Sequence, residues 1–344
     1  MECFKGVFGD VSNGHTLSTG LPGGAAPGIW SERWRLAAIP REEMLRLLFV
    51  SVMVGLLYVM FHFLGNTVEN VQSRSAFQWM FARWRDKISF GADYSHGYLI
   101  PFVSLGVLWY KRRELFAATR RINYLGLGVV VMALAMHWLG AKMQQTRISL
   151  MSLILLLWGI PFYLLGWQTA KLLIFPCAYL IFCIPLNFLD TLAFPLRMFA
   201  STTSAQFLNS IGIAAVQRGS AIFSGASGFE FDVADPCSGL RSLLAMTALT
   251  AVYAYFTQKT LLKKWLLFLC SIPLAVFGNV ARITTIAMMA EAFGQQVALG
   301  IYHDYSGYIL FAAAIALMVA LGSLFNMNYR EQFEKWKSSL FART

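Results

Sequence analysis

Charged residues are scarce in this 344-residue chain, at 13%, whereas hydrophobic residues make up 57%. A soluble domain carries about a quarter charged residues, so this composition excludes a soluble globular protein. A helix that spans a membrane needs about 20 mostly apolar residues, and the chain has enough such stretches for about eight helices. The sequence therefore predicts an all-α polytopic membrane protein.

Cysteine is also rare, and its five occurrences include no C-x-x-C pair. Neither a zinc site nor a disulfide framework is indicated. The sequence also lacks the motifs H-E-x-x-H, G-x-S-x-G and G-x-x-x-x-G-K-[ST]. It therefore offers no motif for a zinc peptidase, a serine hydrolase or a P-loop ATPase, and it implies no cofactor.

The apolar runs predict where the membrane helices lie. We expect helices near residues 44–64, 97–110, 123–140, 150–166, 168–186, 238–256, 261–278 and 305–325. Residues 1–40 are rich in Gly, Ser and Pro near their start and lack an apolar core, so they fit a flexible cytoplasmic tail rather than a signal peptide. The transmembrane domain is expected over 41–328 and a basic cytoplasmic tail over 329–344.

Basic residues predict the orientation, because cytoplasmic loops carry the excess of Lys and Arg. With both termini in the cytoplasm, 18 basic residues fall inside and ten outside. The net charge of +11 arises from short clusters between apolar runs, which are typical of topology signals and contacts with anionic lipid rather than of nucleic-acid binding. On the outside, glycines and an alternating Phe229, Phe231 and Val233 predict a small extracytoplasmic β-hairpin within 217–234.

The clearest candidate for chemistry is the segment DPCSGLR, which opens the apolar run 238–256. Asp235 is a favoured helix N-cap and Pro236 suits the first helical position, which would place Cys237 in the first turn. The positive end of a helix lowers the pKa of a thiol and favours the nucleophilic thiolate. Arg241, four residues on, would share the face of Cys237. In the alternative reading, the cysteine is a small apolar filler and the arginine an interfacial anchor.

Two further candidates lie beside the last two apolar runs: Arg282 follows 261–278, and His303 precedes 305–325. Arg282 could donate the N–H groups of its guanidinium to a developing oxyanion. His303 could shuttle a proton, with Asp304 or a backbone carbonyl fixing its tautomer. Taken alone, each is better explained as an interfacial residue. The predicted topology, however, places Cys237, Arg282 and His303 at the extracytoplasmic ends of three different helices.

The remaining histidine and cysteine candidates are weaker. His96 is also predicted outside and could line the same cavity, in a structural or substrate-contacting role. Cys177, Cys183 and Cys270 lie within apolar runs, where we expect them to stay protonated and inert.

The chain resembles the exosortase family, bacterial membrane cysteine transpeptidases related to the archaeosortases. The matching blocks occur in the order of the family: DYSHGYLIP (93–101), CIPLNFLDTLAFPLRMFAS (183–201), LNSIGIAAVQRGSAIF (208–223), FDVADPCSGLRSL (231–243), NVARI (279–283) and HDYSGYILF (303–311). One departure is Pro236, where the family pattern has a small residue such as alanine before the cysteine.

The resemblance implies a site and a reaction. The catalytic residues would be Cys237, Arg282 and His303, and the substrate-binding or supporting residues would be Arg241, His96, Asp304 and Asn279. The substrates would be exported proteins whose C-terminal sorting signal (PEP-CTERM type) combines a Pro-Glu-Pro type motif, a membrane helix and a basic cluster. The enzyme would cleave this signal through a thioacyl intermediate and transfer the protein to an acceptor. It would lie in the bacterial inner membrane, among membrane lipids, with its active site facing the periplasm.

Two alternatives stay open from the sequence. A cysteine peptidase that only hydrolyses its substrate would share the acylation step with a transpeptidase. A non-peptidase membrane component of exopolysaccharide export or polymerisation would have similar helices and a similar basic balance. That second class gives no reason for a capped Cys-x-x-x-Arg helix start.

Overall fold

The computed structural model describes residues 41–68, 74–85, 94–186, 188–224, 230–232 and 240–327. The expected tails lie outside these residues. The chain divides into the units Met1–Val54 and Gly55–Thr344, and the division falls inside the first helix, α1 (Arg41–Phe63). The described part of α1 in the first unit exposes a run of large apolar side chains, as a lipid-facing helix does.

Each predicted apolar run contains a helix. Besides α1, these are α3 (Ile100–Tyr110), α5 (Tyr124–Lys142), α6 (Thr146–Leu165), α7 (Trp167–Tyr179), α9 (Leu240–Thr257), α10 (Leu261–Phe293) and α12 (His303–Asn326). Within the described part of the chain, five helices are long and apolar enough to span a membrane: Met44–Phe63, Tyr124–Lys142, Thr146–Leu165, Leu261–Phe293 and Tyr305–Asn326.

The other three apolar helices are shorter. The α3 helix has 11 residues, or about 17 Å of rise, against the roughly 30 Å of a hydrocarbon core. The other two apolar stretches are Trp167–Cys183, which includes the turn η2 (Leu180–Cys183), and Ser242–Thr257. The fold is therefore that of a largely helical, multi-pass membrane protein, in which eight apolar helices but only five full-length spans are described.

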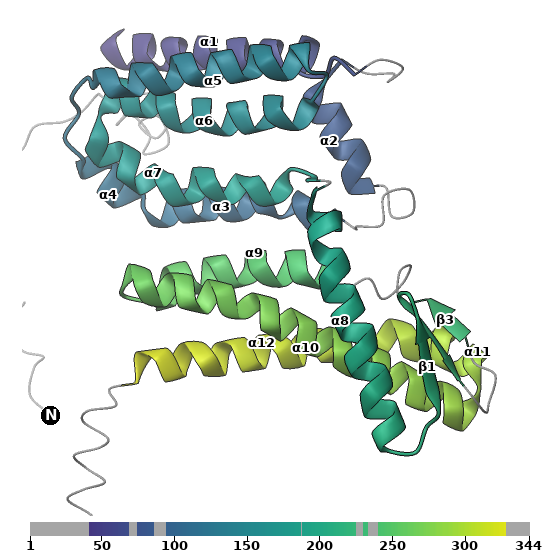
Figure 1. Ribbon diagram of the computed structural model, residues 1–344. Helices are drawn as coiled ribbons and strands as arrows, with labels where there is room; N and C mark the ends of the chain where they lie inside the picture. The colour runs from purple at the N-terminus through teal and green to yellow at the C-terminus, as the bar shows by residue number, and fades with distance from the viewer. Residues whose placement is uncertain are drawn as a thin grey trace, which may run out of the picture. The chain divides into compact units, whose positions relative to one another are not determined.

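Several elements fall between the predicted helices (Figure 1). They are α2 (Ala76–Arg85), η1 (Ser95–Tyr98), α4 (Arg112–Ala117), α8 (Phe188–Ser210), β1 (Ala215–Arg218), β2 (Ala221–Ser224), β3 (Glu230–Asp232), α11 (Gln295–Val297) and η3 (Ala298–Tyr302). The strands form one antiparallel sheet in the order β1-β2-β3.

The predicted hairpin corresponds to part of this sheet. Strands β1 and β2 pair around a turn at Gly219, whose φ of +62° suits glycine. The sheet starts at Ala215, before the predicted range, and gains a third strand, in which Phe231 pairs with Ile222. Phe229 and Val233 lie outside the described residues.

Hydrogen bonds join the α4–α5 connection to the α6–α7 connection. The backbone N–H of Thr119 donates to Oε1 of Gln168 at 3.1 Å, and that of Asn123 donates to the Tyr163 carbonyl at 3.0 Å. These two connections therefore lie on one side of the membrane. They are two of the segments to which the sequence assigns the same, more basic side.

A second set of hydrogen bonds joins connections at the opposite ends of the same helices. Oγ1 of Thr146, at the start of α6, donates to Oδ1 of Asn66, which follows α1, at 2.6 Å. Nε of Arg147 donates to the carbonyl of Pro185, beyond η2, at 2.8 Å. The grouping of connections follows the basic tally, whereas the assignment of either side to the cytoplasm stays a prediction.

An apolar core fixes α9 to the preceding helices near its start. Leu244 and Ala248 of α9 pack in one buried cluster with Trp84 of α2 and Tyr94. The indole of Trp84 also donates from Nε1 to the Cys183 carbonyl at 2.8 Å. The remaining buried members of this cluster are Ala76, Trp79, Met80, Ile100, Leu150, Tyr179, Cys183, Ile184 and Leu186.

A second core joins α8, the sheet and the second half of α10. Its buried members are Ala200, Ala205, Leu208, Ala215, Ile222, Ile283, Ile286, Ala287, Ala290 and Ala298. The α8 helix is tied to α10 by Oγ of Ser204, which donates to the Val280 carbonyl at 3.3 Å. It is tied to β1 by two hydrogen bonds between the Asn209 side chain and the Ala215 backbone. In Figure 1 these elements form the group at the far end of α10.

Candidate functional site

The α10 helix is longer than the membrane core is thick, and it carries the candidate residue Arg282. It has 33 residues, or about 50 Å of rise, whereas the hydrocarbon core is about 30 Å thick. Arg282 lies about 32 Å along the axis from Leu261, near the membrane boundary. The prediction that this helix ends near residue 278 was too short, because Ile283 and Ile286 bury their side chains against α8 and the sheet and so extend it.

The guanidinium of Arg282 lies against α12 at Gly307. A Cβ atom placed on Gly307 would stand 3.4 Å from Nη2 and 3.5 Å from Cζ of Arg282. His303 is the first residue of α12 and lies four positions before Gly307. Positions four apart share one face of a helix. The structure thus brings Arg282 to the face of α12 that includes the position of His303, whose side chain is outside the described set.

Two hydrogen bonds set the alignment of α9 with α12. Oγ1 of Thr250 lies 3.0 Å from Sδ of Met318, and Nδ2 of Asn326 donates to the Thr257 carbonyl at 3.1 Å. The partners are 68 and 69 residues apart, so the two helices advance together in the same direction. Packing of both helices against α10 completes a three-helix group.

This alignment puts the start of α9 at about the level of Gly307, the residue of α12 that Arg282 contacts. The hydrogen bonds between the two segments join residues 64 to 69 positions apart, so counting back equally makes Leu240 level with the part of α12 that contains Gly307. Cys237 precedes Leu240 by three positions in the sequence and lies outside the described residues, as do the predicted cap residues before it. The backbone of Arg241 is in the first turn of α9, but its side chain is not described.

The surroundings of Arg282 are polar and largely closed to water. Asn279, one helical turn earlier on α10, is only 6% exposed, and Ser306 on α12 is 3% exposed. Nε of Arg282 itself is shielded from solvent. Donors in such a water-poor site act on a developing charge more strongly than donors in water.

The structure does not bring all of the other predicted site residues close to Arg282. His96 lies on η1, which packs against α2, α3 and η2, and its ring stacks on that of Tyr94 at a centroid distance of 6.0 Å. Its link to the site is indirect, because Tyr94 belongs to the buried cluster that includes Leu244 of α9. Asp304 is the second residue of α12, and its side chain is outside the described set.

The cysteines of the apolar helices lie away from Arg282. Cys183 is 7% exposed, and its Sγ donates to the Leu180 carbonyl at 2.9 Å. Cys177 and Cys270 are partly buried within α7 and α10. Among the described residues, no three His, Cys, Asp or Glu side chains come together as a metal site would require.

Gly307 is the functional candidate that sequence reasoning missed. It makes room for the guanidinium of Arg282, because any side chain there would meet that group first. The sequence contained a signal that could have identified Gly307. Glycine in a helix interior is less favourable than alanine by about 1 kcal/mol, so such a glycine usually has a packing or functional reason.

Comparison with known proteins identifies the family of the chain. The family model for transmembrane exosortases (Exosortase_EpsH) matches residues 84–320, a range that includes Cys237, Arg282 and His303. No well-characterised relative and no solved structure matched the chain. Since the family match spans more than half of the chain, the protein belongs to the transmembrane exosortase family.

Proposed function

We propose that the protein is a membrane cysteine transpeptidase that cleaves PEP-CTERM type C-terminal sorting signals through a thioacyl-enzyme intermediate. One observation supports this function above all others. The guanidinium of Arg282 lies against α12 at Gly307, one turn after His303 and level with the start of α9. The sequence immediately before that start contains Cys237.

The covalent chain limits how far Cys237 can be from this group. Three consecutive residues span at most about 11 Å between Cα atoms. The thiol therefore belongs to the neighbourhood of the first turn of α9, whatever path the intervening residues take. The guanidinium of Arg282 and the position of His303 lie in the same neighbourhood. Besides the nucleophile, acyl transfer requires a donor for the oxyanion and a group that transfers protons.

In the proposed reaction the thiolate of Cys237 attacks the carbonyl carbon of the scissile peptide bond. The carbonyl oxygen becomes an oxyanion, which accepts hydrogen bonds from the N–H groups of Arg282. His303 donates a proton to the leaving amine as the C–N bond breaks, and a thioester remains on Cys237. His303 then removes a proton from the acceptor nucleophile, whose attack on the thioester releases the thiolate.

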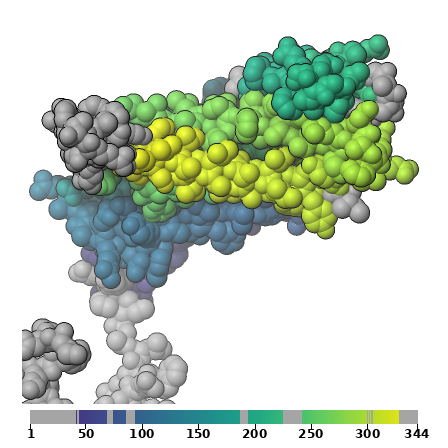
Figure 2. All heavy atoms as spheres, turned by 90° about the horizontal axis from the view of Figure 1, so that it is seen from below, coloured from purple at the N-terminus to yellow at the C-terminus, as the bar shows by residue number. Residues whose placement is uncertain are grey.

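The membrane helix of the sorting signal would lie beside α9, α10 and α12. Tyr305, Tyr308 and Ile309 of α12 are 64%, 78% and 67% exposed, so this end of α12 presents large side chains to its surroundings. Figure 2 shows α12, in yellow, as a continuous strip along the open face of the green α10. A substrate helix held there would keep the motif near Cys237, and proximity would replace a bimolecular search.

The proposed location is the bacterial inner membrane, with both termini in the cytoplasm and the site on the periplasmic side. The excess of basic residues in one set of connections supports this orientation. The partners are exported proteins that bear the tripartite signal, and the surrounding membrane lipids.

The proposal is tested by Cys237→Ala in a strain that expresses a protein with the sorting signal. Processing should stop while the variant accumulates in the membrane as the wild type does. Cys177→Ala, Cys183→Ala and Cys270→Ala serve as matched controls and should process normally. Normal processing by Cys237→Ala would exclude the thioacyl mechanism and favour the non-peptidase role in polysaccharide export. The mass of the product separates the two enzymatic readings, since hydrolysis leaves a free carboxylate and transfer adds the mass of an acceptor.

A further inference from the structure

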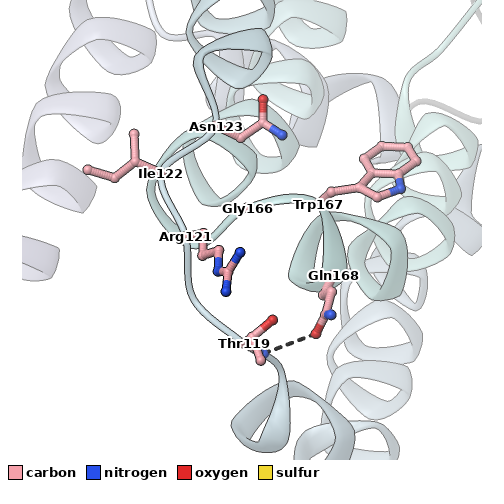
Figure 3. A pocket seen from close by; sticks show the side chains of 7 residues that line it. All are labelled: Thr119, Arg121, Ile122, Asn123, Gly166, Trp167 and Gln168. Carbon is pink, nitrogen blue, oxygen red and sulfur yellow. Dashed lines mark hydrogen bonds between the residues drawn. The ribbon is translucent and has the colours of Figure 1, made fainter.

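A pocket lies between the two hydrogen-bonded connections at the opposite ends of the helices from Arg282. It has a volume of about 490 Å³ and is lined by Thr119, Arg121, Ile122, Asn123, Gly166, Trp167 and Gln168. Figure 3 shows the guanidinium of Arg121 extending into the pocket, on the side where Thr119 and Gln168 are joined by a hydrogen bond. Nothing in the proposed reaction uses this pocket.

The frame of the pocket is fixed by the backbone. The N–H of Arg121 donates to the Leu165 carbonyl at 3.3 Å, in addition to the hydrogen bonds from Thr119 and Asn123 described above. Gly166 has a φ of +85°, and a side chain there would collide with the carbonyl oxygen of Arg121. The backbone at Arg121 is therefore fixed before any ligand arrives, which sets where its exposed side chain begins and lowers part of the ordering cost of binding.

The charge around the pocket is positive. Arg121 and Arg120 follow the basic start of α4, and the one acidic residue of that segment, Glu114, is paired with Lys111 at 2.6 Å. The first turn of α7 adds to this potential, because no described side chain caps its backbone N–H groups. Nζ of Lys171 lies 5.6 Å from the centroid of the Trp167 ring. An anion is the ligand that these groups favour.

Exposed apolar residues flank the pocket, and Ile122 and Trp167 among them also line it. Ile122, Tyr124 and Leu125 are 63%, 76% and 73% exposed, and the last two open the span Tyr124–Lys142. Trp167 is 45% exposed and starts the apolar stretch of α7. Tryptophan and tyrosine prefer the headgroup level of a bilayer. These exposed residues suit a position at the headgroup level, where a phosphate and acyl chains meet and where a lipid gains apolar contacts that a free phosphate cannot make.

We propose that this pocket binds the phosphate group of an anionic phospholipid. Arg121 donates its N–H groups to the phosphate oxygens, while the acyl chains lie against Ile122 and Leu125. Inorganic phosphate could accept the same hydrogen bonds from Arg121, but the adjoining apolar residues favour the lipid. Binding here would tie the α4–α5 and α6–α7 connections to one leaflet, whether or not the proposed cleavage reaction is correct.

The test is native mass spectrometry of the full-length protein in detergent, titrated with phosphatidylglycerol or phosphatidylcholine. Phosphatidylglycerol should bind the wild type more tightly, and Arg121→Gln should weaken that binding about tenfold, as expected for the loss of a charge-assisted hydrogen bond. Arg120→Gln removes the same charge one position away from the pocket lining and should leave binding within about twofold. Gly166→Ala keeps every charge but disturbs the fixed backbone at Arg121, so it should weaken binding as well.

Three results would overturn the proposal. Equal loss of affinity in Arg120→Gln and Arg121→Gln would reduce the effect to general surface charge. Equal affinity for the two lipids would remove the role of the anion. Displacement of phosphatidylglycerol by millimolar inorganic phosphate would assign the pocket to a soluble phosphate instead. These measurements follow lipid binding alone, so their outcome is independent of the Cys237→Ala experiment.

Discussion

Replacement of Gly307 by leucine tests whether the guanidinium of Arg282 must lie where the structure places it. A Cβ atom at Gly307 would lie 3.4 to 3.7 Å from Nη2, Cζ and Nε of that arginine, which is ordinary van der Waals contact. Alanine therefore fits with little movement. A leucine side chain extends further from Cβ into the volume that the guanidinium occupies, so it must displace the donor.

The expected magnitude follows from the role of the donor. Loss of one oxyanion donor typically lowers the rate about 100- to 1000-fold, and Gly307→Leu should approach this loss. Gly307→Ala should keep most of the activity. It should also raise the free energy of unfolding by up to about 1 kcal/mol, because alanine is favoured over glycine inside a helix. A defect in activity would then be separated from a defect in stability.

The assay is the initial rate of cleavage of a peptide with the sorting motif by purified enzyme, with the melting temperature measured in parallel. Gly128→Leu is the matched control, since a Cβ at Gly128 of α5 would meet no described atom within 4 Å. A double variant with Arg282→Lys should be no slower than Arg282→Lys alone, because both changes affect the same donor. Wild-type turnover by a folded Gly307→Leu enzyme would refute the assignment of Arg282 at this position.

The remaining predictions concern the chemistry and the topology. Arg282→Lys should stay impaired by at least about 100-fold, since lysine keeps the charge but loses the planar donor fork; recovery of the rate would make Arg282 an anchor only. His303→Ala should alter the pH profile of cleavage and accumulate a covalent adduct on Cys237 where resolution slows more than acylation, which mass spectrometry of the enzyme would detect. Reporter fusions within 111–121 and 257–264 should behave as cytoplasmic, and export of either would reverse the proposed orientation.

The apolar helices could be predicted because a helix that spans lipid has a simple signal in the sequence. Every backbone polar group in the membrane core must be satisfied within its own helix, so an apolar run of sufficient length already defines the element. The runs near 123–140 and 305–325 are helices in the structure with ends shifted by a few residues. The length signal is weaker for α3, where only 11 residues are helical.

The elements outside the lipid were harder to predict, because they depend on contacts far apart in the sequence. The α8 helix presents Ser201 and Ser204 on the face that meets the sheet turn and α10, through hydrogen bonds to the Ser220 and Val280 carbonyls. Small polar residues on a buried face give no apolar periodicity. The extension of α10 beyond residue 278 has the same cause, since its second half is buried against α8 and the sheet rather than in lipid.

The candidate site shows which part of such a prediction can come from residues and which part needs geometry. Residue types and topology selected Arg282 and His303, but they could not show how the two helices approach each other. The structure shows that approach at Gly307 of α12, which has no functional group, and it shows the register of α9 against α12 at Thr250 and Met318. Packing among α9, α10 and α12 therefore brings the guanidinium of Arg282 against α12, and a small residue at position 307 leaves that part of the helix surface open to it.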